Sequence, residues 1–126
     1  NWLVRKDKDG YLIDLTLNQR SMDLMMTFSI NPTQYVMLGM AVCGHLTYKT
    51  NIKHSLGNFK HNVINPHIYD RHLWAIDEIF EKTPLDIQPT IELKTYKYFY
   101  DYTIDDFIIN VPKGIEKLSK TLEIAI

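Results

Sequence analysis

The chain has 126 residues, of which 45% are apolar and 23% charged, and its formal net charge is −1. These values are typical of a soluble globular domain, and they exclude a disordered chain or one drawn generally to nucleic acid or membranes. A single cysteine, Cys43, excludes an internal disulfide framework and fits a reducing, cytoplasmic location. We therefore expect one domain over residues 1–126, with no metal and no cofactor.

Residues 2–30 have the pattern of three β-strands separated by two turns. The sequence "DKDG" (Asp7–Gly10) is a turn signal that ends in glycine, and "NQRS" (Asn18–Ser21) is the second turn. Between these turns, apolar and polar residues alternate, which gives the strand one apolar face. The third strand is expected over Leu24–Ile30.

Two similar segments, "INPTQY" (Ile30–Tyr35) and "INPHIY" (Ile64–Tyr69), each predict the start of a helix. In both, an asparagine (Asn31 or Asn65) can cap the helix, and a proline can occupy its first position, where no N–H is needed. The likeness fades beyond these residues. We therefore interpret the segments as two separate helices rather than as a structural repeat.

The two helices differ in character. The first, about Pro32–Tyr48, has no charged residue on any side and is predicted to be the central buried helix. It completes an uncharged run that begins at Leu24, but an Asn-Pro pair interrupts this run, so a membrane span is not expected. The second helix, about Pro66–Lys82, is amphipathic, and Trp74 falls on its charged side.

Between the two helices, Gly57 and Asn58 suit a two-residue hairpin turn, with an irregular loop as the alternative. This turn would place His54 opposite His61. Two neighbouring histidines can share a metal or exchange a proton near neutral pH, and His67 follows in the sequence. No carboxylate lies near His54 or His61 in the sequence to orient their rings, which favours strand residues without a catalytic role.

The last third of the chain predicts two strands and a helix. Residues 90–102 have the clearest strand pattern, with every second residue from Tyr96 to Tyr102 a tyrosine on one face. A further strand is expected over 106–111, unless Thr103 opens a helical turn there. A last helix is predicted over Lys113–Ile124. The order of elements predicts an α+β fold in which about three helices cover a mainly antiparallel sheet.

Two surfaces are candidates for binding another protein. Tyrosine is enriched at binding hot spots, and a tryptophan ringed by carboxylates resembles an anchor inside a charged rim. The alternatives are that a helix covers the tyrosine face, and that the first strand or the last helix covers the tryptophan. The candidate binding residues are Trp74, Asp70, Asp77, Glu78, Glu81, Tyr96, Tyr98, Tyr100, Tyr102, Asp105 and Asp106.

The sequence contains no Gly-rich phosphate loop, no HExxH and no nucleophile elbow. We therefore interpret the chain as a non-enzymatic inhibitor or immunity protein of bacterial type that masks a basic partner, such as a toxin or nuclease. The alternative is an enzyme that cleaves phosphoesters or RNA with His54, His61 and His67. A sheet that binds single-stranded nucleic acid is a second alternative, which the acidic residues around the tyrosines disfavour. No membrane contact is expected, and a homodimer is compatible with the sequence.

Overall fold

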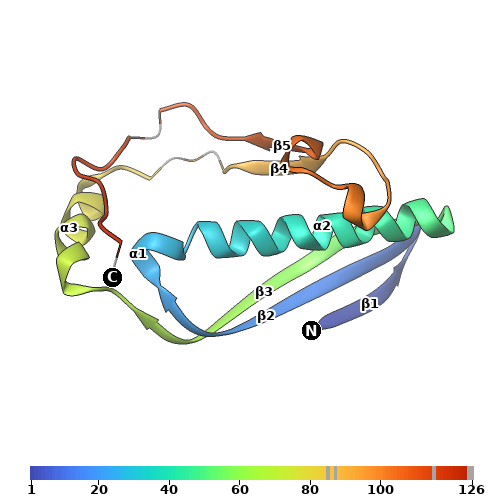
Figure 1. The fold of residues 1–126 in the computed structure, drawn as a ribbon, viewed down its shortest axis with the longest axis horizontal. Helices are drawn as coiled ribbons and strands as arrows, with labels where there is room; N and C mark the ends of the chain where they lie inside the picture. Colours follow the sequence, from blue (N-terminus) through green and yellow to red (C-terminus); the bar gives the residue numbers. More distant parts are fainter. Residues whose placement is uncertain (85, 87, 115, 125–126) are drawn as a thin grey trace.

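Figure 1 shows a computed structural model of the chain, which describes residues 1–84, 86, 88–114 and 116–124. Its layers are a three-stranded sheet, the long helix α2 (Ile30–Thr50) and a two-stranded ribbon on the other side of that helix. The short helices α1 (Leu24–Thr27) and α3 (Leu73–Glu81) lie at one end of α2, near the end of the chain. The expected α+β fold with about three helices is confirmed.

The first two strands form an antiparallel hairpin, as the sequence predicts. Strand β1 (Trp2–Asp7) pairs with β2 (Gly10–Asp23), and Asp7 lies opposite Gly10 across the turn. Gly10 has a φ of 157°, and a Cβ atom added there would collide with the main-chain carbonyl of Lys53. Glycine is required at this position because a second strand passes so close to it.

The second predicted turn is wrong, because β2 continues through Asn18–Ser21 to Asp23. From Gly10 onward β2 pairs in parallel with β3 (Lys53–His67), a strand that follows α2 in the chain. This pairing gives hydrogen-bond partners to the backbone at Asn18–Ser21 and keeps it extended. The predicted third strand, Leu24–Ile30, is wrong as well, because α1 occupies most of it.

Strand β3 is continuous, so the predicted hairpin at Gly57–Asn58 is also wrong. These residues form a bulge instead, because the register between the strands shifts between Ile13 and Leu15 of β2. The carboxylate of Asp14 accepts a hydrogen bond from the Asn58 amide at 2.7 Å across this bulge. Glycine suits a bulge as well as a turn, and the long-range pairing decides between them.

Helix α2 runs close to its predicted bounds, although its cap differs from the prediction. Ser29 precedes the helix, so Asn31 is not its capping residue. Gly39 faces the sheet, where an added Cβ would lie 2.7 Å from a leucine methyl of β3, and Gly44 faces the ribbon, where it would collide with the Tyr102 hydroxyl. Each glycine lowers helix propensity by about 1 kcal/mol relative to alanine, but together they let both layers approach α2 closely.

The surface of α2 is less completely buried than its uncharged sequence predicts. Its buried residues are Gly39, Ala41, Cys43 and Gly44, whereas Ile30, Tyr35, Leu38 and Tyr48 are exposed. No helix in the described part of the chain has both the length and the hydropathy needed to cross a membrane.

The second proline-led helix begins later than predicted. Asn65 and Pro66 belong to the end of β3, and α3 starts at Leu73 after a 3₁₀ turn over Asp70–His72. Asn65 is therefore not a helix cap. Pro66 is tolerated because it lies near the end of an outer strand of the sheet, where a missing N–H need not break the ladder.

The ribbon beyond α2 pairs β4 (Thr90–Leu93) with β5 (Phe107–Asn110) in antiparallel fashion. Strand β5 confirms the strand expected over 106–111. The helical turn weighed as its alternative also exists just before it, over Ile104–Asp106, with a capping box between Thr103 and Asp106.

Two predictions for the end of the chain are wrong. The tyrosine-rich strand stops at Leu93, because its partner β5 is only four residues long, and Phe99–Asp101 form a 3₁₀ turn. The described residues of Lys113–Ile124 form turns, bends and coil but no helix, and Ile115 lies outside the described residues. Gly114 has a φ of 88°, which interrupts a helix. That residues 1–126 form one independent domain stays a prediction.

Candidate functional site

Polar side chains gather where the parallel strands β2 and β3 end together. Ser21 lies opposite Asn65, and Asp23 lies opposite His67. Ser21 Oγ is 3.4 Å from His67 Nδ1, so a hydroxyl group and an imidazole share this edge of the sheet. The carboxyl ends of parallel strands are a common place for ligands, because the loops that leave them converge around a crevice. The residues that meet here, called the strand-end cluster below, are Ser21, Asp23, His67, Tyr69 and His72.

Asp23 joins the strand to the helix that follows it. Its Oδ1 accepts hydrogen bonds from the amides of Met25 at 2.9 Å and Met26 at 3.2 Å, which caps the short helix α1. Its Oδ2 lies 3.9 Å from His72 Nδ1. Because the side chain is 13% exposed, this carboxylate is shielded but not sealed from a ligand.

His72 is the most deeply buried large side chain in the described part of the molecule, with 1% of its surface exposed. Its Nε2 lies 2.8 Å from the main-chain oxygen of Glu123, near the end of the chain. Its Nδ1 is buried and has no hydrogen-bond partner among the described residues. A buried polar atom without a partner costs about 1–3 kcal/mol, so His72 Nδ1 lowers stability unless water or a ligand forms a hydrogen bond with it.

Tyr69 contributes an aromatic ring to the cluster, and it lies close to one cation. Its ring meets those of His67 and His72 edge to face, at centroid distances of 5.2 and 6.2 Å. The guanidinium of Arg71 lies 5.7 Å from the centre of the Tyr69 ring. Arg20, which directly precedes Ser21, is exposed, and it forms no ion pair within the described ranges.

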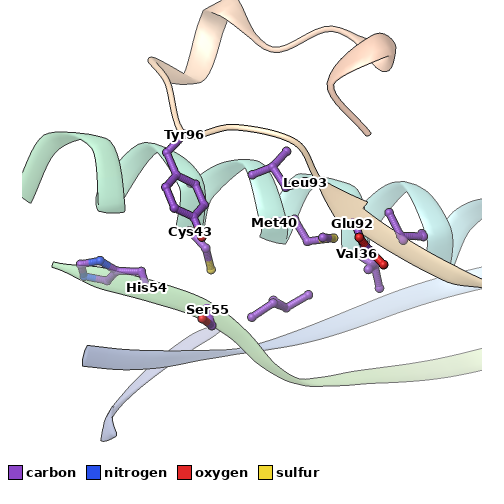
Figure 2. A pocket seen from close by; sticks show the side chains of 11 residues that line it. Val36, Met40, Cys43, His54, Ser55, Glu92, Leu93 and Tyr96 are labelled. Atoms are coloured by element: carbon purple, nitrogen blue, oxygen red, sulfur yellow. The ribbon is translucent and has the colours of Figure 1, made fainter. Parts of the chain in front are cut away.

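A separate cavity of about 550 Å³ lies between α2, β3 and β4 (Figure 2). Tyr96, His54 and Cys43 lie toward one end of it, and Glu92 and Val36 toward the other. Burial raises the pKa of the Cys43 thiol to about 11, so the thiol is protonated and unreactive at neutral pH. The described residues that line the cavity include one carboxylate and no lysine or arginine. The cavity is therefore a poorer site for an anionic ligand than the strand-end cluster.

The structure separates the three candidate histidines along one strand. His54 and His61 are seven residues apart in β3, which corresponds to about 23 Å, so they cannot act as a pair. His54 stacks on Tyr11 at 5.3 Å, and His61 Nε2 lies 2.9 Å from the side-chain oxygen of Gln19. His67 alone belongs to the strand-end cluster. The predicted pairing failed because it depended on the hairpin.

The four candidate tyrosines do not form a row on one strand face. Tyr96, Tyr98 and Tyr100 are exposed in the segment after β4. Tyr102 is half-buried: its hydroxyl accepts a hydrogen bond from the Lys97 amide at 3.1 Å and donates one to the Thr95 carbonyl at 3.2 Å. This residue therefore closes a loop against Gly44 of α2 and has a structural role.

The face of α3 that carries Trp74 is partly covered by the end of the chain. Trp74 is half-buried, with the Lys120 ammonium 5.8 Å from its ring. Glu78 accepts hydrogen bonds from the Ser119 hydroxyl at 2.7 Å and the Ser119 amide at 2.8 Å, and the serine hydroxyl is the main reason why the pKa of Glu78 lies below its ordinary value. The covering segment was predicted as a helix, but it packs here as coil.

The remaining acidic candidates are distributed over two regions. Asp106 pairs with Lys97 at 2.7 Å, and this ammonium is the main reason why the pKa of Asp106 lies below its ordinary value. Asp106 also caps the turn that leads into β5. The other acidic candidates are exposed, and they are Asp70, Asp77, Glu81 and Asp105.

Sequence reasoning missed most of the strand-end cluster. The sequence pattern places Ser21 in a turn, Asp23 in no element, and His72 within an amphipathic helix. The available signal was the order Arg20-Ser21-Met22-Asp23, in which charged and polar residues end a strand with one buried methionine among them. Recognising it requires knowing that β3 lies alongside.

The chain resembles known enzymes in sequence and in fold. Residues 1–122 match the family model described as thymidylate synthase. The chain is 36% identical over 105 residues to a thymidylate synthase of Streptococcus gordonii, a match covering 82% of this chain and 35% of that protein. It is 35% identical over 107 residues to one from Lactococcus lactis subsp. cremoris, covering 82% and 36% respectively. The chain thus spans about a third of the length of the curated relatives it matches.

A solved structure gives the same picture of the fold. Thermostable thymidylate synthase A from Bacillus subtilis superposes with a TM-score of 0.70 at 24% identity, over 96% of this chain and 40% of that chain. These similarities overturn the interpretation of the chain as an inhibitor or immunity protein, because the matching proteins are synthases. The expected basic protein partner is wrong for the same reason, and so are the phosphoester-cleaving and nucleic-acid-binding alternatives.

Proposed function

Because the chain belongs to the thymidylate synthase family, we propose that it supplies the nucleotide-binding part of an enzyme that forms thymidylate. The observation that carries this proposal is the meeting of Ser21 and His67 at the carboxyl ends of β2 and β3, with the exposed Arg20 next to Ser21 in the chain. All three residues lie inside the matched range, 1–122.

The chemistry of the strand-end cluster fits a pyrimidine nucleotide. Thymidylate carries a phosphate dianion, to which a guanidinium and a hydroxyl bind well, so we assign Arg20 and Ser21 to the phosphate. A pyrimidine ring carries N–H and carbonyl groups, which need acceptors and donors. Asp23 supplies an acceptor, and the imidazole of His67 can hold or transfer a proton.

The thiol of Cys43 has no part in this proposal. It is buried under α2, and its raised pKa of about 11 leaves it neutral at physiological pH. Formation of a bond to the pyrimidine is therefore not assigned to this residue. The cytoplasmic location predicted from the single cysteine belongs to the same proposal.

Isothermal titration of the full-length protein tests the phosphate assignment. We expect Arg20→Ala to weaken the binding of thymidylate and of its unmethylated counterpart, deoxyuridylate, by about tenfold to a hundredfold, because a hydrogen bond to a charged group contributes about 1.5–3 kcal/mol. The binding of thymidine, which has no phosphate, should not change. Lys60→Ala is the matched control, since Lys60 is an exposed cation in the middle of β3. Equal nucleotide affinity in the two variants would contradict the assignment.

A further inference from the structure

The loop between β4 and β5, residues 94–106, is joined to α2 by one polar contact. The main-chain amide of Phe99 donates a hydrogen bond to His45 Nδ1 at 3.2 Å. Among the described residues, every other hydrogen bond or ion pair made by residues 94–106 joins two members of the loop itself. The loop therefore folds on its own polar contacts and docks on the helix through His45.

The direction of this hydrogen bond fixes the protonation state of the ring. A main-chain N–H only donates, so His45 Nδ1 accepts with its lone pair and the hydrogen of the neutral ring lies on Nε2. A second proton on the ring would place one N–H against another and remove the bond. Histidine is the side chain that changes charge between about pH 5 and pH 8. The contact between Phe99 and His45 thus exists in the neutral form of the ring alone.

The surroundings of His45 do not compensate a positive charge. The ring is half-buried and meets Tyr98 edge to face at 5.2 Å. One turn further along α2, the Lys49 ammonium lies 5.3 Å from the centre of the same Tyr98 ring, and Tyr100 lines the same cavity of about 310 Å³. Asp101, the carboxylate of this turn, is exposed, and His45 forms no ion pair within the described ranges. A proton on His45 therefore adds a charge near a like charge and gains no counter-ion.

We propose that His45 makes the docking of the 94–106 loop depend on pH: the neutral ring holds Phe99 against α2, and the protonated ring releases it. Release would also loosen the close packing of Tyr102 on Gly44, where an added Cβ would collide with the tyrosine hydroxyl. The proposal does not depend on the proposed function, because His45 lies near the end of α2 and the strand-end cluster lies beside its start (Figure 1).

Two substitutions separate the acceptor atom from the ring. His45→Asn places an amide oxygen close to the position of Nδ1, and this oxygen takes up no proton between pH 5 and 8, so the loop should stay docked throughout. His45→Phe keeps a ring against Tyr98 but has no acceptor for the Phe99 amide, so the loop should be released at every pH.

Hydrogen exchange of the Phe99 amide, followed by NMR in the full-length protein, measures the docking directly. The quantity compared is the protection factor, which removes the intrinsic effect of pH on exchange. Between about pH 7.5 and about pH 5.5 we expect it to fall about threefold to tenfold in the wild type, the value of one neutral hydrogen bond, and to stay constant in His45→Asn. The control is the Lys94 amide, which donates to the Asp106 carbonyl at 2.9 Å and should keep its protection in every variant.

Three results would overturn the proposal. The first is a Phe99 protection factor that stays constant in the wild type while nitrogen-15 resonances show the His45 ring gaining its second proton. The second is an equal fall in His45→Asn, because another group would then cause the pH dependence. The third is hydrogen on Nδ1 of the neutral ring. If His45→Phe does not fold, the wild type and His45→Asn still decide the question.

Discussion

Two polar clusters lie along the parallel pair of β2 and β3, and they differ in how fully their hydrogen bonds are made. The first, called the bulge cluster below, consists of Arg5, Asp14 and Asn58. Its Asp14 carboxylate accepts hydrogen bonds from Arg5 Nε at 2.7 Å, Arg5 Nη2 at 2.8 Å and the Asn58 main-chain amide at 2.7 Å. In the strand-end cluster, Asp23 Oδ2 and His72 Nδ1 face each other at 3.9 Å without a hydrogen bond. Both clusters combine a carboxylate with basic groups, so composition alone does not tell them apart.

The difference indicates that the bulge cluster stabilises the fold, whereas the strand-end cluster has hydrogen-bonding groups left over for a ligand. When every polar group in a network is hydrogen-bonded, these bonds offset the free energy lost by removing the charges from water. When a group is left without a partner, the fold is less stable until a ligand supplies one. Changes in the bulge cluster should therefore alter stability and leave nucleotide binding intact. Changes in the strand-end cluster should alter nucleotide binding more than stability, except where they remove the cap that Asp23 gives to α1.

The largest effect on stability is expected from Gly57→Ala. A Cβ atom at this position would collide with the Asp14 carboxylate, which is already held by Arg5 and Asn58. Displacing it should cost about 1–3 kcal/mol of unfolding free energy, measured from urea midpoints. Asn58→Ala is the control, because its backbone N–H still donates to Asp14. Equal midpoints for Gly57→Ala and wild type would show that the bulge tolerates a methyl group.

A smaller loss of stability is expected from Asp23→Ala, because it removes the cap of α1. The loss should be about 1 kcal/mol, the usual value for a helix cap. Asp23→Asn keeps a capping oxygen and should melt close to the wild-type temperature while still losing the charge that faces His72. Similar melting losses in both variants would mean that the charge of Asp23, rather than its cap, stabilises the fold.

Ser21→Ala should affect binding more than stability. Its hydroxyl lies 3.4 Å from His67 Nδ1, which is too long for a strong bond within the protein. We expect thymidylate affinity to fall by about tenfold by calorimetry, the lower end of the range for a hydrogen bond to a charged group, with no change in melting temperature. Ser55→Ala, a half-buried serine of β3 at the separate cavity, is the matched control. An equal loss of affinity in both would remove Ser21 from the site.

The smallest effect is a dependence of stability on acid pH in the bulge cluster. The Arg5 guanidinium and then the Asn58 amide hold the pKa of Asp14 at about 2, below its ordinary value of 3.8. The native state therefore binds this proton less readily than the unfolded state, so the stabilisation is present above pH 3.8 and is lost as the pH falls toward 2. The gap in melting temperature between wild type and Asp14→Asn should narrow over that interval. A gap that stays constant down to pH 2 would contradict the assignment.

Local signals in the sequence were enough to predict the elements that are determined by residues close together in the chain. The Asn31-Pro32 pair predicted the start of α2 to within two residues, and the Thr103–Asp106 pair indicated, as an alternative, the turn that precedes β5. Such features are set by residues three or four positions apart, which a reader of the sequence can see.

Features that depend on distant residues were missed. Gly57 looks like a turn residue until Asp14, more than forty residues earlier, is known to lie across from it. The strand-end cluster escaped for the same reason, since Ser21 meets His67 only after β2 and β3 have paired. The sequence gives no signal for His72, because what sets it apart is a buried nitrogen without a hydrogen-bond partner among the described residues.

The long connection through α1 and α2 also determines when, during folding, the strand-end cluster forms. Ser21 and His67 are separated by 46 positions, and parallel pairing across such a distance is among the slower steps of folding. A nascent chain on the ribosome would have no affinity for nucleotide until β3 had emerged and docked. The binding of thymidylate added during refolding should thus show when β3 pairs with β2, and it should not accelerate the earlier folding steps.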